Sequence, residues 1–221
     1  MPRLLVLRPE PGASATAERA RARGLDAVIV PLFEVEPVQW EAPEAGGFDG
    51  LLLTSANAVR HASDQLEALR GLKTYAVGEA TAEAARDKGF DIAATGDAGV
   101  GRLLGSIERD LKLLHLCGED RTAISDARQT ITPVVVYRSK AVDAPDLSAA
   151  QGNFVLIHSP RAGGRFAELV DGRSSVTVIA ISDAAARAAG EGWKQVEVAD
   201  EPSDEALLAL AASLCNKPDP K

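Results

Sequence analysis

Residues 51–60 read Leu-Leu-Leu-Thr-Ser-Ala-Asn-Ala-Val-Arg, and this stretch decides the fold. An apolar run ends at two hydroxyl residues, Thr54 and Ser55, and a helical pattern begins directly after them. Uninterrupted apolar runs are typical of strands buried on both faces of a parallel sheet, and a hydroxyl residue is a favoured helix N-cap. A turn of this kind exposes backbone N–H groups at the positive end of a helix dipole, where a carboxylate or phosphate can bind. The stretch therefore predicts an α/β fold with an anion-binding turn.

The same pattern occurs again 104 positions later in the chain. Residues 155–162 read Val-Leu-Ile-His-Ser-Pro-Arg-Ala, so that Ser159 takes the place of Ser55. A second pair of strand-to-helix turns keeps the same offset, with Gly78 in one and Ser182 in the other. Two matches at one offset indicate a duplicated unit. We therefore predict two similar lobes, each with two anion-binding turns.

Composition limits the kinds of partner and site. The chain has 221 residues, which is enough for one large domain or two of roughly 100 residues. A net charge of −8 argues against nucleic acid as a partner, because a duplex-binding protein needs a basic surface. No apolar run approaches the ~18 residues of a membrane span, and the N-terminal residues lack the pattern of a signal peptide. We expect a cytoplasmic protein with no membrane contact.

Metal binding and disulfides are not expected. The two cysteines, Cys117 and Cys215, are far apart, and the three histidines show no ligand spacing. Cys117 ends an apolar run and is interpreted as a small buried hydrophobic residue.

Two extended segments connect the predicted lobes. Residues 34–38 alternate in polarity and residues 131–136 strongly favour a strand, so the two should pair as a ribbon. We predict a first lobe from residues 1–34 and 142–221, a connecting ribbon from 35–39 and 134–141, and a second lobe from 40–133 inserted into the first. A cleft between such lobes, at the carboxyl ends of the strands, is a common ligand site. The pattern also predicts a helix from Ser55 to about Leu69 and a further helix over residues 122–129.

Short strings along nearly the whole chain carry a family resemblance. They are Arg8-Pro9, residues 53–59, residues 77–81, Val136-Tyr137-Arg138, residues 158–162, Ile181-Ser182 and Glu201-Pro202-Ser203. In this order and spacing they resemble the uroporphyrinogen-III synthase family. The resemblance implies an α/β fold of two flavodoxin-like parallel-sheet lobes joined by a two-stranded β ladder, with the second lobe inserted into the first.

The resemblance also implies an activity. Family members are cyclising hydro-lyases of porphyrin, tetrapyrrole and heme biosynthesis. They convert the linear tetrapyrrole hydroxymethylbilane to uroporphyrinogen III without a cofactor. Water is lost, ring D inverts through a spiro intermediate, and the macrocycle closes. We expect a monomer, and a transient contact with the preceding enzyme of the pathway stays open.

Tyr137 is the candidate catalytic residue. It matches the recurring tyrosine of the family and lies at the end of the predicted ribbon, where its phenol could face the cleft. The phenol could donate a proton to the leaving hydroxyl or hold the substrate in position. The alternative is a tyrosine that only packs across the ribbon.

The substrate carries eight carboxylates, so the candidate binding residues are those of the turns and the cations near strand ends. They are Thr54, Ser55, Ala56, Asn57, Gly78, Thr81, Ser159, Pro160, Arg161 and Ser182, with Arg8 and Arg138. Ordinary helix capping is the alternative role for the turn residues. Thr81 matches a family threonine, but its counterpart in the other lobe is Ala185, so there the hydroxyl role falls to Ser182.

Three rival functions follow from the same residues. A non-catalytic two-lobed module that closes on an anionic metabolite would use the same turns, and only Tyr137 and the family strings argue against it. Nucleotide binding is disfavoured because no glycine fingerprint is present. A hydrolase triad built on His158 with Asp183 or Asp200 is disfavoured because no Gly-x-Ser-x-Gly elbow is present.

Overall fold

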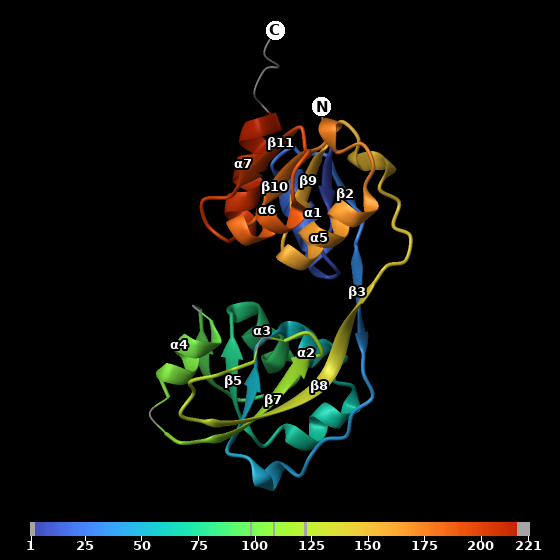
Figure 1. The fold of residues 1–221 in the computed structure, drawn as a ribbon. Coiled ribbons are helices and arrows are strands. Elements are labelled where there is room, and N and C mark those ends of the chain that lie inside the picture. Colours follow the sequence, from blue (N-terminus) through green and yellow to red (C-terminus); the bar gives the residue numbers. More distant parts are fainter. Residues whose placement is uncertain (1–2, 98, 108, 122, 216–221) are drawn as a thin grey trace. The chain divides into compact units, whose positions relative to one another are not determined.

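The computed structural model describes residues 3–97, 99–107, 109–121 and 123–215 (Figure 1). The chain divides into two compact units. The first unit comprises residues 1–34 and 141–221, and the second unit comprises residues 35–140. The second unit is thus an uninterrupted insertion in the first.

The first unit is a five-stranded parallel sheet in the order β11-β10-β9-β1-β2. Its strands are β1 (Leu4–Val6), β2 (Ala27–Ile29), β9 (Phe154–Ile157), β10 (Thr177–Ala180) and β11 (Gln195–Val198). Its helices are α1 (Gly12–Ala22), α5 (Pro160–Leu169), α6 (Asp183–Ala189) and α7 (Asp204–Cys215). Buried residues of α5 and α6 share one hydrophobic cluster, and those of α1 and α7 share another. The sheet is therefore covered on both faces, which explains its solidly apolar strands.

The second unit contains a six-stranded sheet in the order β3-β8-β7-β4-β5-β6. The strands are β3 (Phe33–Pro37), β4 (Gly50–Leu53), β5 (Lys73–Val77), β6 (Ile92–Gly96), β7 (Lys112–Gly118) and β8 (Thr130–Ala141). The helices are α2 (Ala56–His61), α3 (Glu79–Asp87) and α4 (Val100–Gly105). The buried residues of α2 and α3 share a cluster that excludes α4, which packs on Leu52 and Leu113 in a cluster of its own. The predicted α/β fold with two parallel-dominated sheets is confirmed.

The two sheets have the same spatial order but different chain order. Strands β4, β5 and β6 occupy the places of β9, β10 and β11, and β7 and β8 occupy those of β1 and β2. In the first unit, counted along the chain, this order is the flavodoxin-like 2-1-3-4-5. In the second unit the chain enters at the third strand of that order, so this unit is a circular permutation of the first. The strand order reverses between β1 and β9 in one unit and between β7 and β4 in the other, and α/β sheets bind ligands at such points.

The predicted ribbon between residues 34–38 and 131–136 is confirmed and extended. Strand β3 neighbours β8, and the Val38 N–H donates to the Val136 carbonyl at 3.0 Å. On its other side β8 pairs in parallel with β7 from Thr130 to Tyr137. The long strand β8 is therefore an integral part of the sheet in the second unit.

Two helix predictions were wrong. The helix after Ser55 ends at His61, and a 3-10 helix follows from Asp64 to Leu69, because Ser63 adopts a positive φ of 56° between them. Residues 123–129 form no helix, and Thr122 lies outside the described residues.

The segment from 123 to 129 crosses the α4 side of the second unit instead. Its apolar residues Ile124 and Ala127 pack against the cluster that contains α4. The Gln129 amide donates to three carbonyls, those of Leu104, Ile107 and Arg109. These tertiary contacts outweigh the weak helical pattern of the segment.

None of the helices in the described part of the chain is both long and apolar enough to cross a membrane.

Candidate functional site

Both predicted turns of the first unit are capped helix N-termini. At the end of β9, the Ser159 hydroxyl accepts a hydrogen bond from the Ala162 N–H at 3.2 Å, and Pro160 occupies the first helical position of α5. At the end of β10, the Ser182 hydroxyl accepts from the Ala185 N–H at 3.3 Å. Each cap satisfies one of the free N–H groups of its helix. The remaining N–H groups of the first turn can donate hydrogen bonds to an anion, which the helix dipole also attracts.

The matching turns of the second unit are built differently. The Ser55 hydroxyl accepts from the Asn57 N–H at 3.2 Å, and Ala56 and Asn57 form the first turn of α2. Gly78 precedes α3 with a φ of 82°, and no side chain caps this helix. Thr81 is only 5% exposed. The turn before α3 therefore offers backbone N–H groups rather than a hydroxyl.

Thr54 bonds to a buried histidine and not to the helix. Its hydroxyl oxygen lies 2.9 Å from Nε2 of His115, which comes from the neighbouring strand β7 and is 3% exposed. Burial, followed by the nearby charge of Arg121, lowers the pKa of His115 to about 4. The imidazole is therefore neutral at pH 7, and it fixes the position of the Thr54 hydroxyl where the strand order of the second unit reverses.

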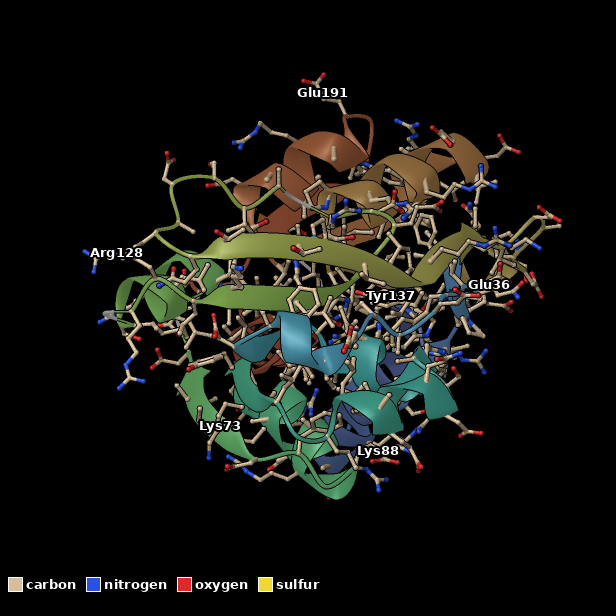
Figure 2. All side chains as sticks on the ribbon, turned by 90° about the horizontal axis from the view of Figure 1, so that it is seen from below. Glu36, Lys73, Lys88, Arg128, Tyr137 and Glu191 are labelled. Atoms are coloured by element: carbon tan, nitrogen blue, oxygen red, sulfur yellow. The ribbon has the colours of Figure 1, made fainter. Side chains whose placement is uncertain are left out.

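Tyr137 lies on β8 at the carboxyl end of β7. The ring packs on Gly118 and on the cluster beneath α2 and α3, and its centroid is 6.3 Å from that of His61. Figure 2 labels Tyr137, whose ring lies against Gly118 of β7. Tyr137 is half-buried, and among the described residues its phenol has no hydrogen-bond partner. The hydroxyl is therefore available to a ligand.

The three predicted arginines have protein partners. The Arg138 Nε donates to Glu36 on the neighbouring strand β3. The Arg161 guanidinium lies 4.3 Å from the centre of the Phe33 ring. Arg8 approaches the carboxylate of Asp204 to 3.6 Å. Each would have to share or exchange a partner to bind a carboxylate.

Asp204, at the start of α7, is the centre of a polar cluster in the first unit. Its carboxylate accepts from the Thr16 hydroxyl, the Arg19 Nε and the His158 Nε2, each at 2.9 Å. Burial alone would raise the pKa of Asp204, but hydrogen bonds from His158, Arg19 and Thr16 outweigh it and hold the pKa well below the usual range. Burial lowers the pKa of His158, so a neutral imidazole donates to the carboxylate. The partner of His158 is therefore Asp204, and the hydroxyl in the cluster donates to the same carboxylate, so the cluster contains no activated nucleophile.

The candidate residues form two groups, one in each unit. Arg8, Ser159, Pro160, Arg161 and Ser182 belong to the first unit, and Thr54, Ser55, Ala56, Asn57, Gly78, Thr81, Tyr137 and Arg138 belong to the second. Within the described residues, no cluster of three or more His, Cys, Asp or Glu side chains could hold a metal ion.

Sequence reasoning did not identify the residues around Thr54 and Tyr137. These are His61, His115, Gly118 and Arg121. Three of them lie on β7 or shortly after it, at the reversal of strand order. Their position at the reversal of strand order can be recognised only once β7 is known to lie beside β4.

Comparisons with known proteins agree on one family. The family model described as uroporphyrinogen-III synthase HemD matches residues 14–209. The crystal structure of uroporphyrinogen-III synthetase from Helicobacter pylori superposes with a TM-score of 0.69 and 21% identity, covering 97% of this chain and 100% of that chain. A mutant uroporphyrinogen III synthase from the extremely thermophilic bacterium Thermus thermophilus gives a TM-score of 0.52 and 18% identity, covering 98% of this chain and 100% of that one. None of the curated proteins matches the chain.

Proposed function

The chain belongs to the uroporphyrinogen-III synthase family, and we propose that its helix N-termini bind the acid groups of the substrate while Tyr137 assists loss of the hydroxyl. The enzyme is a cyclising lyase. It converts hydroxymethylbilane, a linear tetrapyrrole, to uroporphyrinogen III with inversion of ring D and loss of water.

The proposed carboxylate sites are the turns at Ser55, Gly78, Ser159 and Ser182. Each turn lies at the carboxyl end of a parallel strand and precedes a helix. One anion at a helix N-terminus contributes about 0.3–1 kcal/mol at an exposed site and up to about 2 kcal/mol when partly buried. Several weak sites acting together would hold a flexible polyacid in one conformation. Oriented N–H groups also suit a chain with a net charge of −8, because they attract an anion locally where the overall field repels it.

The chemistry needs little more than position and one proton. Loss of the hydroxyl leaves a carbocation stabilised by the pyrrole nitrogen, and ring D must then be held so that its substituted carbon attacks. Orientation of this kind can lower the activation free energy by several kcal/mol. A correctly placed acid contributes about 10²–10⁴-fold. The phenol of Tyr137 has no hydrogen-bond partner in the described part of the chain, and this observation supports the role.

The test is an isomer assay with Tyr137→Phe. Hydroxymethylbilane is supplied, and the type III product is separated from the type I isomer that forms spontaneously. We expect the rate of type III formation to fall by about 10²-fold while some type III product remains, because the turns still orient the chain. Tyr75→Phe is the matched control, since Tyr75 is the other tyrosine and packs in the α4 cluster. A Tyr137→Phe enzyme as fast as Tyr75→Phe would refute the role of Tyr137.

The same assay tests whether the chain is a binding protein only. In that case the wild-type chain would yield type I product alone at the uncatalysed rate.

Two further points stay predictions. They are that the enzyme is cytoplasmic and that it is a monomer. Light scattering after size-exclusion chromatography tests the second.

A further inference from the structure

Gly118 lies directly under the ring of Tyr137. It is the last residue of β7, and it pairs with Tyr137 after a register shift between Cys117 and Gly118. The Glu119 N–H donates to the Tyr137 carbonyl at 3.0 Å, which fixes the two strands against each other at this point. A methyl group on Gly118 would lie 2.8 Å from both Cε2 and Cζ of the ring and 3.0 Å from the phenol oxygen. The ring therefore rests on bare backbone.

The ring, and not the backbone, requires glycine here. Gly118 is not among the glycines with positive φ, so its backbone conformation would admit alanine. What excludes a side chain is the far end of the tyrosine ring, which is planar and can make room only by moving as a whole. Because the contact is with Cζ and the oxygen, it sets the position of the hydroxyl more directly than that of the Cβ end.

We infer that Gly118 is a positioning residue for Tyr137: the absence of a side chain at the end of β7 sets where the phenol hydroxyl sits. His61 approaches the same ring, with 39° between the ring planes, and limits its movement further. The inference rests on the proposed role of Tyr137 and adds the residue that makes this role geometrically possible.

The expected effect follows from the distances. Carbon atoms in contact are about 3.5–4.0 Å apart, so a methyl group at 2.8 Å must displace the ring by about 1 Å. A misplacement of about 1 Å can reduce the rate of an oriented reaction by about 10²-fold. We therefore expect Gly118→Ala to lower kcat for type III product by about 10- to 100-fold with little change in KM. Gly101→Ala is the control, because a methyl group there meets no atom within 4 Å.

A double-mutant cycle separates positioning from general damage. If Gly118 acts through the phenol, adding Gly118→Ala to Tyr137→Phe should cause no further loss of rate, because the hydroxyl is already gone. An equal loss in both backgrounds would overturn the inference. A Gly118→Ala enzyme as fast as Gly101→Ala, alongside a slow Tyr137→Phe enzyme, would overturn it alone. A Tyr137→Phe enzyme at the wild-type rate would overturn the proposed role and the inference together.

Stability provides a readout that does not depend on activity. If Gly118→Ala folds poorly, Gly118→Ala combined with Tyr137→Ala should match the unfolding midpoint of Tyr137→Ala alone, because the obstructing ring is absent. A Gly118→Ala penalty that persists without the ring would show that alanine meets some other atom, and the inference would fail.

Discussion

Replacing Asp204 by asparagine should destabilise the first unit by about 3 kcal/mol. The carboxylate accepts hydrogen bonds from Thr16, Arg19 and His158, and its side chain is 15% exposed. These donors come from α1 and from the end of β9, so Asp204 ties the start of α7 to both. Asparagine keeps one acceptor oxygen but turns an N–H group toward donors that need an acceptor.

The magnitude follows from the contacts. A hydrogen bond to a charged group contributes about 1.5–3 kcal/mol, and breaking a buried ion pair costs about 3–5 kcal/mol. The Arg19 side chain is 45% exposed, so water can replace part of that interaction. We therefore expect a value near the lower end of the range, about 3 kcal/mol, and a fall in Tm of about 10 °C for a unit of this size.

The assay is calorimetry with Asp200→Asn as the matched control, because Asp200 is exposed. The pKa of Asp204 is held well below its usual range, so its contribution to stability is full above the unfolded pKa of about 4 and is lost as the pH falls below it. The difference between variant and wild type should therefore be full at neutral pH and shrink in acid below about pH 4. Equal stability of Asp204→Asn and Asp200→Asn at neutral pH, or a difference that does not shrink below about pH 4, would refute this reasoning.

Three further predictions concern other contacts. Gly163→Ala should cost about 1–3 kcal/mol in urea unfolding, because a methyl group there lies 2.7 Å from the Ala185 carbonyl oxygen, whereas Gly164→Ala next to it, with 3.9 Å to its nearest neighbour, should not destabilise. His115→Gln should make stability fall less steeply between pH 6.5 and about 4. The unfolded histidine takes up a proton near 6.5 but the folded one only near 4, so the wild type has this additional loss of stability and the variant does not, as urea midpoints at about pH 7 and about pH 5 would show. Ser159→Ala removes the cap of α5 and should lower stability by about 1 kcal/mol, and steady-state kinetics should show a higher KM with kcat nearly unchanged if the turn binds substrate uniformly.

Local sequence signals predicted the turns well. An apolar run followed by a hydroxyl residue and a helical pattern predicted caps at Thr54 or Ser55, at Ser159 and at Ser182. Ser55, Ser159 and Ser182 each accept a hydrogen bond from an N–H of the first turn. These hydrogen bonds join residues two or three positions apart, so both partners lie in the same short stretch of sequence. The repeat at a constant offset also predicted two similar sheets, which is confirmed.

Non-local features could not be predicted in the same way. The place of β7 beside β4 depends on strand pairing between distant parts of the chain, and nothing near His115 indicates that its partner is Thr54, 61 positions away. Gly118 follows an apolar strand as many glycines do, and only the register with β8 shows that a ring covers it. The Asp204 cluster joins residues up to 188 positions apart and has no sequence motif.

The insertion has a consequence for engineering. In the first unit, the Val142 N–H donates to the Leu32 carbonyl at 3.0 Å, so the two points where the chain departs and resumes are hydrogen-bonded neighbours. The inserted piece likewise starts and finishes on adjacent strands, β3 and β8. A short turn could therefore join the two segments of the first unit after the second unit is removed. The second unit could in turn be inserted into another protein. Each half carries a covered sheet of its own, which makes the enzyme a natural starting point for split or swapped chimeras.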